Sequence, residues 1–135
     1  MDQCLFCKIL KGTVPCAKVF EDAHTFAFLD INPVQKGHTL VIPKKHADNL
    51  FLIEPLELQK VIAAVQKVAK AVKSGVEAEG INLIQSNHLA AGQSIDHIHF
   101  HVIPRFPNDG LQHWPQGKYA EGQMDVVRER IAKLL

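Results

Sequence analysis

Three histidines alternate with large apolar residues in the segment 94–105, SIDHIHFHVIPR. Side chains along an extended strand point to opposite faces in turn, so His97, His99 and His101 would share one face. Imidazole changes charge near neutral pH, and its neutral form serves as a nucleophile or a metal ligand. The segment is therefore compatible with a metal site, a catalytic site or a polar sheet face.

The spacing disfavours a single metal ion held by all three histidines. His97 and His101 would lie about 13 Å apart along a strand, whereas the ligand nitrogens of one zinc ion lie roughly 3 Å apart. A zinc hydrolase built on these three side chains is disfavoured for the same reason. A metal site formed by two of these histidines and a ligand distant in the sequence remains an open alternative. A solvated sheet face typically carries Thr, Lys, Glu and Ser, so three histidines are unusual there.

Nucleophilic catalysis fits the pattern better. A neutral imidazole nitrogen can attack phosphorus and form a covalent intermediate. Neighbouring imidazoles, Gln93, Ser94 and main-chain N–H groups could stabilise the phosphate oxygens. His99 has a histidine on each side along the strand, which makes it the best candidate for the nucleophile.

Apolar periodicity predicts the elements that must position these residues. Strands are expected at 17–21, 25–31, 37–43, 80–85 and 96–103. A long helix is expected at 54–73, where Pro55 suits the first helical position and the apolar residues form one stripe. Short helical segments are expected near 4–11 and 124–134. This order predicts an α+β fold with a mainly antiparallel sheet.

Composition narrows the class of protein. The 135 residues suit one domain, 1–135, and the net charge of +1 argues against a general binder of nucleic acid or membrane surfaces. The N-terminus does not read as a signal peptide, and the apolar runs are too short to span a bilayer. Three cysteines in such a chain favour a reducing compartment, and we expect a cytoplasmic protein.

Residues 97–103, HIHFHVI, resemble the signature of the histidine triad (HIT) family, in which three histidines alternate with hydrophobic residues. The likeness runs from about residue 4 to 117. It includes Asp30, the stretch GHTLVIPKKH that holds His38, Asn87 and the pair Gln93-Ser94. The stretch HWPQG at 113–117 is similar to the tail of the Hint-type branch.

This resemblance implies a HIT-like fold and a homodimer that hydrolyses or transfers purine nucleotides without a metal in the chemistry. By the motif match, His99 would be nucleotidylated at the α-phosphate, and His97 and His101 would orient it and contact the phosphate. His38 would support the triad from behind. The remaining substrate contacts would be Asp30 on the ribose hydroxyls, and Asn87, Gln93 and Ser94 at the phosphate or leaving group.

Cys4-Leu5-Phe6-Cys7 has the spacing of a zinc knuckle. A thioredoxin-like motif would follow a strand, and residues 1–3 leave no room for one. Triad proteins with such a pair resemble the hexose-phosphate uridylyltransferases, whose zinc is completed by two histidines; the matching positions are His46 and His97. Four protein ligands would make this zinc structural. The alternative is two reduced cysteines that pack as small apolar residues.

Three functions stay open. A phosphoramidase that acts on AMP–amine conjugates is expected first, because the tail and the Gln93-Ser94 loop are similar to the Hint-type branch. A dinucleoside polyphosphate hydrolase is the close alternative, although Ile103-Pro104 stand where that branch carries glutamine. The third is a nucleotide-binding adaptor without catalysis, which would not require His99.

Overall fold

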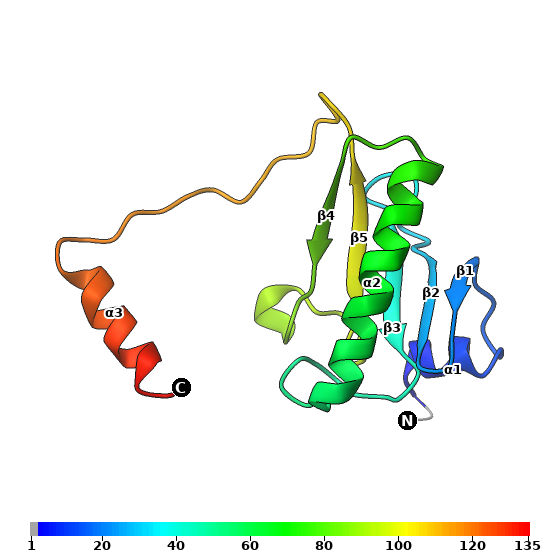
Figure 1. Cartoon of the computed structure of the whole chain (residues 1–135), viewed down its shortest axis with the longest axis horizontal. Coiled ribbons are helices and arrows are strands. Elements are labelled where there is room, and N and C mark those ends of the chain that lie inside the picture. Colours follow the sequence, from blue (N-terminus) through cyan, green and yellow to red (C-terminus); the bar gives the residue numbers. More distant parts are fainter. Residues whose placement is uncertain (1–2) are drawn as a thin grey trace.

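The computed structural model describes residues 3–135, which form a five-stranded antiparallel sheet with one long helix across one face (Figure 1). The elements in chain order are α1 (Leu5–Leu10), β1 (Lys18–Glu21), β2 (Thr25–Leu29), β3 (Thr39–Pro43), α2 (Pro55–Gly75), β4 (Gly80–Ile84), the 3₁₀ turn η1 (Leu89–Ala91), β5 (Phe100–Arg105) and α3 (Gln123–Ala132). The strand order is β1-β2-β3-β5-β4. The α+β fold with a mainly antiparallel sheet is thus confirmed. None of the described helices is long and apolar enough to cross a bilayer.

Helix α2 covers one face of the sheet with the apolar stripe expected from its sequence. Its buried residues are Val61, Ala64, Val65, Val68 and Val72. They form one core cluster with Ala27, Val41, Ile98 and Val102, against which Phe100 packs. The apolar residues between the three histidines therefore face α2, and the histidines face the other side of the sheet.

Helix α1 packs on that other side. Phe6 and Ile9 of α1 join Phe28, Leu40 and Ile42 in a second core cluster. Phe6 also makes edge contacts with the rings of His97 and His99, at centroid distances of 5.9 and 5.2 Å. The CxxC segment at the start of α1 is thereby placed against the triad.

The expected strand 96–103 is shifted, because β5 covers Phe100–Arg105 and His97 and His99 precede it. The β3–β5 pairing ends at Val41 and Phe100. Continued by two residues, it would place Pro43, which has no N–H to donate, opposite Ile98. The Pro43 carbonyl instead accepts a hydrogen bond from the His97 ring at 2.9 Å. The Ile98 N–H donates to the Ala47 carbonyl at 2.7 Å.

The chain beyond β5 forms a C-terminal arm, residues 106–135, that runs away from the sheet and ends in α3 (Figure 1). An ion pair holds its root: Arg105 Nε donates to Asp109 Oδ2 at 2.7 Å and Arg105 Nη2 to Asp109 Oδ1 at 3.0 Å. Arg105 Nη1 also donates to Asn82 Oδ1 in β4 at 2.6 Å. The start of the arm is therefore tied to the sheet.

Candidate functional site

Four side chains from three distant segments meet beside α1 and form the metal-ligand cluster, Cys4, Cys7, His46 and His97. Cys4 and Cys7 bracket the start of α1, His46 follows β3, and His97 precedes β5. Their ligand atoms all lie within 4.8 Å of one another. Sequence reasoning named these same four residues, and the structure shows that they could hold a metal ion.

The distances in this cluster fit a tetrahedral ion. The two Nδ1 atoms of His46 and His97 are 3.2 Å apart. The Cys7 Sγ lies 3.4 Å from His46 Nδ1 and 3.7 Å from His97 Nδ1, and the Cys4 Sγ lies 3.6 Å from His97 Nδ1. Zinc bonds in a tetrahedral site require about 3.3 Å between two nitrogens and about 3.6 Å between nitrogen and sulfur.

Hydrogen bonds on the far side of each ring fix the tautomer that a metal needs. His97 Nε2 donates to the Pro43 carbonyl at 2.9 Å, and His46 Nε2 donates to Asp48 Oδ1 at 2.8 Å. Each ring therefore presents an unprotonated Nδ1 to the cluster. Burial lowers the pKa of His97 to about 4, so its ring is neutral at physiological pH.

The cysteines supply charge that a cation would balance. Burial, followed by the hydrogen bond and charge of neighbouring Cys4, raises the pKa of the Cys7 thiol. Two adjacent thiolates are thus unfavourable without a cation, and a coordinating metal deprotonates such thiols. The donor set of two sulfurs and two nitrogens is the one that zinc prefers.

A second cluster, which we call the imidazole relay, consists of Asp30, His38 and His101. Its ligand atoms also lie within 4.8 Å of one another. The Val34 N–H donates to His38 Nδ1 at 3.1 Å, so the proton of this neutral ring must lie on Nε2. His38 Nε2 then donates to His101 Nδ1 at 2.8 Å. A metal would compete with that proton, so the hydrogen bonds favour proton transfer over metal binding.

The relay leaves a donor on the outer nitrogen of His101. Because its Nδ1 accepts from His38, neutral His101 carries its proton on Nε2. Burial lowers the pKa of His101 to about 4, and the nearby His99 and His38 add to the effect. Asp30 Oδ2 lies 3.7 Å from His38 Nε2, close enough to stabilise positive charge on the relay.

His99 has the opposite tautomer. Its Nδ1 donates to the main-chain carbonyl of His97 at 2.7 Å, so Nε2 carries the lone pair. The ring is 6% exposed, and burial lowers its pKa, partly offset by the bond to the His97 carbonyl. The neutral ring therefore has an unprotonated Nε2, the atom that could act as a base or a nucleophile.

Both His99 and His101 line a cavity of about 360 Å³ beside α1. Its polar lining residues include Asp30, Asn32, Ser94, His99 and His101. Its apolar walls include Leu5, Phe6, Ile9, Val14, Phe28, Leu40 and Ile95. A cavity of this volume is large enough for a small ligand, and its lining includes the rings of both His99 and His101.

Two residues expected at the phosphate, Gln93 and Asn87, are not among those that line this cavity. The Gln93 amide nitrogen donates to the carbonyls of Asp48 and Ile95 at 2.6 and 2.9 Å, and its oxygen accepts from the His88 N–H at 2.8 Å. Asn87 Oδ1 accepts from the Leu50 N–H at 2.8 Å. These side chains hold neighbouring loops together. The cavity lining includes Ser94, Asp30 and the triad members His99 and His101.

Several contacts that orient the imidazoles carried no signal in the sequence. The Pro43 and His97 carbonyls and the Val34 N–H are main-chain groups, which any residue supplies. Asp48, two residues after His46, is the exception, because a carboxylate close to a histidine ligand is a common orienting group.

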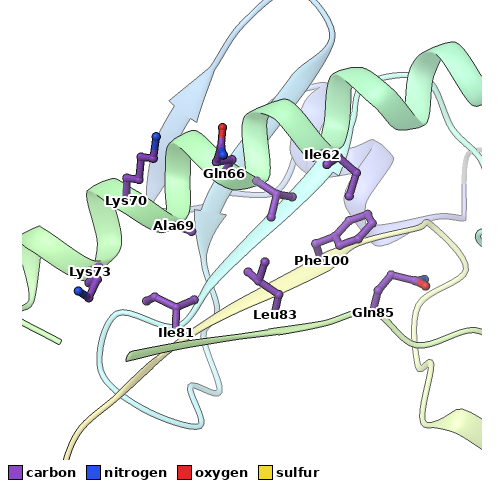
Figure 2. A pocket seen from close by; sticks show the side chains of 10 residues that line it. Ile62, Gln66, Ala69, Lys70, Lys73, Ile81, Leu83, Gln85 and Phe100 are labelled. Carbon is purple, nitrogen blue, oxygen red and sulfur yellow. The ribbon is translucent and has the colours of Figure 1, made fainter. Parts of the chain in front are cut away.

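A larger groove of about 490 Å³, the α2–β4 groove, lies between helix α2 and strand β4 (Figure 2). Ile62, Val65, Ala69, Ile81, Leu83 and Phe100 give it an apolar floor. The polar groups in its lining are two glutamines and the ammonium groups of Lys70 and Lys73. These apolar side chains, amides and ammonium groups are better suited to contact with another molecular surface than to catalysis of bond cleavage.

Comparison with known proteins gives concordant results. A family model described as "HIT domain" matches residues 11–108. Adenosine 5′-monophosphoramidase hnt1 from Schizosaccharomyces pombe is 41% identical over 132 residues, 96% of each chain. A HIT family member from Bacillus subtilis superposes with a TM-score of 0.91 at 41% identity over 98% of this chain and 97% of that one. A zinc-bound histidine triad family protein from Mycobacterium smegmatis gives a TM-score of 0.79 at 35% identity over 98% and 96%.

Proposed function

Because this chain belongs to the HIT domain family, we propose that it hydrolyses purine nucleoside phosphoramidates, with His99 as the nucleophile. The observation that carries this proposal is the tautomer of His99. The His97 carbonyl accepts the Nδ1 proton of His99 at 2.7 Å. Nε2 of this buried ring therefore carries an unshared electron pair, and the ring lines the cavity. The phosphoramidase activity named for the fission-yeast relative supports the choice of substrate.

In the first step, His99 Nε2 attacks the α-phosphorus and the bond from phosphorus to the amine nitrogen breaks. The product is a nucleotidyl-His99 intermediate and a free amine. The leaving nitrogen needs a proton, and His101 Nε2–H is the donor that the relay prepares. For this step the relay carries one proton taken up from solvent; Asp30 stabilises its positive charge, and the transfer to the leaving nitrogen returns both rings to the neutral state.

In the second step, water attacks the same phosphorus and the bond to His99 Nε2 breaks. The relay accepts the proton of the water, so His99 and the relay return to their starting states and the nucleoside monophosphate leaves. We propose that Ser94, which lines the cavity, contacts the phosphate and that Asp30 contacts the ribose. Gln93 and Asn87 hold the surrounding loops through their hydrogen bonds.

We propose that the metal-ligand cluster binds a structural zinc ion. Its four donors, their spacing and their fixed tautomers all support this identity. Zinc would tie α1, the segment after β3 and His97 together, and four protein ligands leave no coordination position for a substrate. The chemistry at phosphorus belongs to His99 and the relay. Reduced thiols, which such a site needs, support a cytoplasmic location.

The partner in this proposal is a second copy of the chain. Strand β4 is an edge strand whose outer side is unpaired in the described sheet, and the apolar α2–β4 groove runs beside it. Leu83 of β4 is 54% exposed and Ile62 of α2 is 47% exposed. An edge strand next to an apolar groove favours pairing with an identical edge.

The test compares adenosine 5′-phosphoramidate with diadenosine tetraphosphate as substrates of the unmodified chain, His99→Ala and the control His24→Ala. His24 is an exposed histidine outside the cavity. We expect AMP from the phosphoramidate, a loss of at least about 10³-fold in kcat with His99→Ala, and no change with His24→Ala. Denaturing mass spectrometry during turnover should find AMP on the peptide that contains His99.

Each other outcome has a distinct meaning. If only diadenosine tetraphosphate were cleaved, the proposed substrate class would be wrong, but the proposed role of His99 as the nucleophile would stand. AMP binding without turnover of either compound would favour a nucleotide-binding adaptor. Full activity of His99→Ala would remove the proposed mechanism.

A further inference from the structure

Cys16 is the one cysteine that the metal-ligand cluster does not use. The chain has three cysteines, and Cys4 and Cys7 belong to that cluster. Cys16 is a free, half-buried thiol that lines the same cavity as His99 and His101. Neither the proposed zinc site nor the proposed hydrolysis requires this thiol, so its place in the cavity is still without a role.

The backbone places Cys16 across from Asp30. Strands β1 and β2 pair antiparallel with Lys18 opposite Phe28, and the Leu29 N–H donates to the Ala17 carbonyl at 3.0 Å. One further residue in the same register puts Cys16 opposite Asp30, and both residues line the cavity. Side chains opposite each other on neighbouring strands have Cβ atoms about 4.5–5.5 Å apart. The thiol therefore lies beside the carboxylate that we assign to the ribose.

An independent observation indicates that a ligand enters this cavity. The ring of His99 is 6% exposed and lines the cavity. Its Nδ1 donates to the His97 carbonyl at 2.7 Å, and within residues 3–135 its Nε2 has no hydrogen-bond partner. Polar atoms of buried side chains are nearly always hydrogen-bonded. The partner of Nε2 therefore has to come from the cavity.

The cavity has room for one occupant. Its volume of about 360 Å³ lies near the lower end of the range for pockets that bind small molecules. Cys16, Asp30, Ser94 and His99 all contribute to its lining. A group bonded to the Cys16 sulfur and a nucleotide bound at Asp30 and His99 would therefore compete for the same space.

The three thiols differ in what is free to react with them. A metal in the cluster would bind Cys4 and Cys7 as thiolates and so withhold both from other reactions. Cys16 packs at the edge of the core cluster that includes Phe28 and Leu40, with its side chain half-buried. Exchange between a thiol and a disulfide requires access to the sulfur, and the cavity provides that access at Cys16.

We propose that Cys16 is a modification site at which a low-molecular-weight disulfide, such as oxidised glutathione, closes the cavity to nucleotides. This inference rests on the proposed function, because it describes the regulation of the same cavity. The Cys16 thiolate attacks one sulfur of the disulfide, and the bond between the two sulfurs of the disulfide breaks. The second sulfur leaves as a thiolate and takes up the proton that Cys16 released. The products are a mixed disulfide at Cys16 and one free thiol, and a reducing thiol reverses the exchange.

The test treats the full-length chain and its matched variant Cys16→Ser with oxidised glutathione. Peptide mass spectrometry locates the adduct, titration calorimetry counts the AMP-binding sites, and a zinc-sensitive dye measures any metal released. In the unmodified chain, AMP-binding sites should disappear in proportion to the fraction of Cys16 that carries glutathione, without release of metal. Dithiothreitol should restore them. Cys16→Ser, compared with its own untreated sample, should lose no sites.

Protection by the nucleotide gives a second readout. If the adduct and AMP exclude each other, only chains with an empty cavity react. With AMP at 100 times its dissociation constant, modification of Cys16 should therefore slow about 100-fold. An unchanged rate would show that the thiol reacts from outside the cavity and would overturn the proposal.

The other outcomes separate this inference from the proposed function. Glutathione on Cys16 with AMP binding unchanged, or no adduct at Cys16 in excess disulfide, would overturn the inference and leave the hydrolysis standing. An equal loss of sites in Cys16→Ser, with metal released, would assign the inhibition to Cys4 and Cys7. A reversible block of AMP binding in a chain that cleaves neither test substrate would keep the inference and overturn the hydrolysis. Absence of AMP binding in the untreated chain would overturn both.

Discussion

The metal-ligand cluster and the imidazole relay lie at the two ends of one short segment, residues 97–101, yet their histidines are prepared for opposite tasks. In the metal-ligand cluster, the Pro43 carbonyl and the Asp48 carboxylate accept the Nε2 protons of His97 and His46. The Nδ1 atoms that face the cluster are therefore unprotonated. In the second, a main-chain N–H occupies His38 Nδ1 and forces a proton onto the facing nitrogen. The group behind an imidazole thus decides whether its facing nitrogen is free to bind a metal or carries a proton.

Loss of the metal should have the largest effect on stability. Cys7→Ser removes one of four ligands, and we expect the free energy of unfolding to fall by on the order of 4 kcal/mol, the value for a ligand at about 1,000 times its dissociation constant. Urea unfolding with metal analysis checks this, and Cys16→Ser is the matched control that should keep the metal. If Cys7→Ser lost its metal without losing stability, the cluster would not have the structural role assigned to it.

The relay should affect catalysis without affecting the metal. His38→Phe keeps a ring of similar size but removes the donor to His101, and we expect kcat to fall about 100-fold with metal content unchanged. His38→Gln restores an N–H donor and should recover part of the loss. Equal activities of the phenylalanine and glutamine variants would show that the hydrogen bond to His101 does not matter.

A smaller change should separate the orienting carboxylate from the ligands. Asp48→Ala removes the acceptor behind His46, which we expect to weaken metal binding by about tenfold. Competition with a zinc-sensitive dye measures the affinity. Asp96→Ala, an exposed aspartate outside the cluster, serves as the control. An unchanged affinity in Asp48→Ala would mean that His46 is held by packing alone.

The smallest expected effect is the pH dependence of stability that His101 contributes. Burial lowers its pKa from 6.5 to about 4, so the unfolded chain binds this proton at a higher pH than the folded one. The stability from His101 is therefore complete above about pH 6.5 and is lost as the pH falls toward 4. When the pH falls from about 7.5 to 5, the free energy of unfolding of the unmodified chain should decrease by about 1 kcal/mol more than that of the His101→Gln variant. Equal losses would contradict the depressed pKa.

Much of the site followed from residue spacing because its main elements are regular. Alternation placed the three histidines on one side and Ile98, Phe100 and Val102 on the other, and this division holds although the strand begins only at Phe100. The shortened strand depends on Pro43 in the neighbouring strand and on a ring that bonds its carbonyl. A pattern read along one segment does not contain that information.

The side chains whose contacts the sequence does not reveal are those with main-chain partners. Gln93 and Asn87 carry amides suited to a phosphate, but each binds the backbone of a loop. Their roles depend on which carbonyls and N–H groups come close after folding. The short helix at the end of the arm was expected from periodicity, but the periodicity of that segment does not show that the arm runs away from the sheet.

His97 takes part in the metal-ligand cluster and in the orientation of His99 through different atoms, with consequences for how such a protein can change over generations. Its ring faces the cysteines, whereas its main-chain oxygen holds the proton of His99. Any amino acid at position 97 keeps that oxygen, so a descendant that replaced this histidine and both cysteines with apolar residues would lose the candidate metal site but keep the acceptor for the His99 proton. The two properties can therefore be inherited separately, and dependence on metal supply can disappear from a lineage without a new catalytic design.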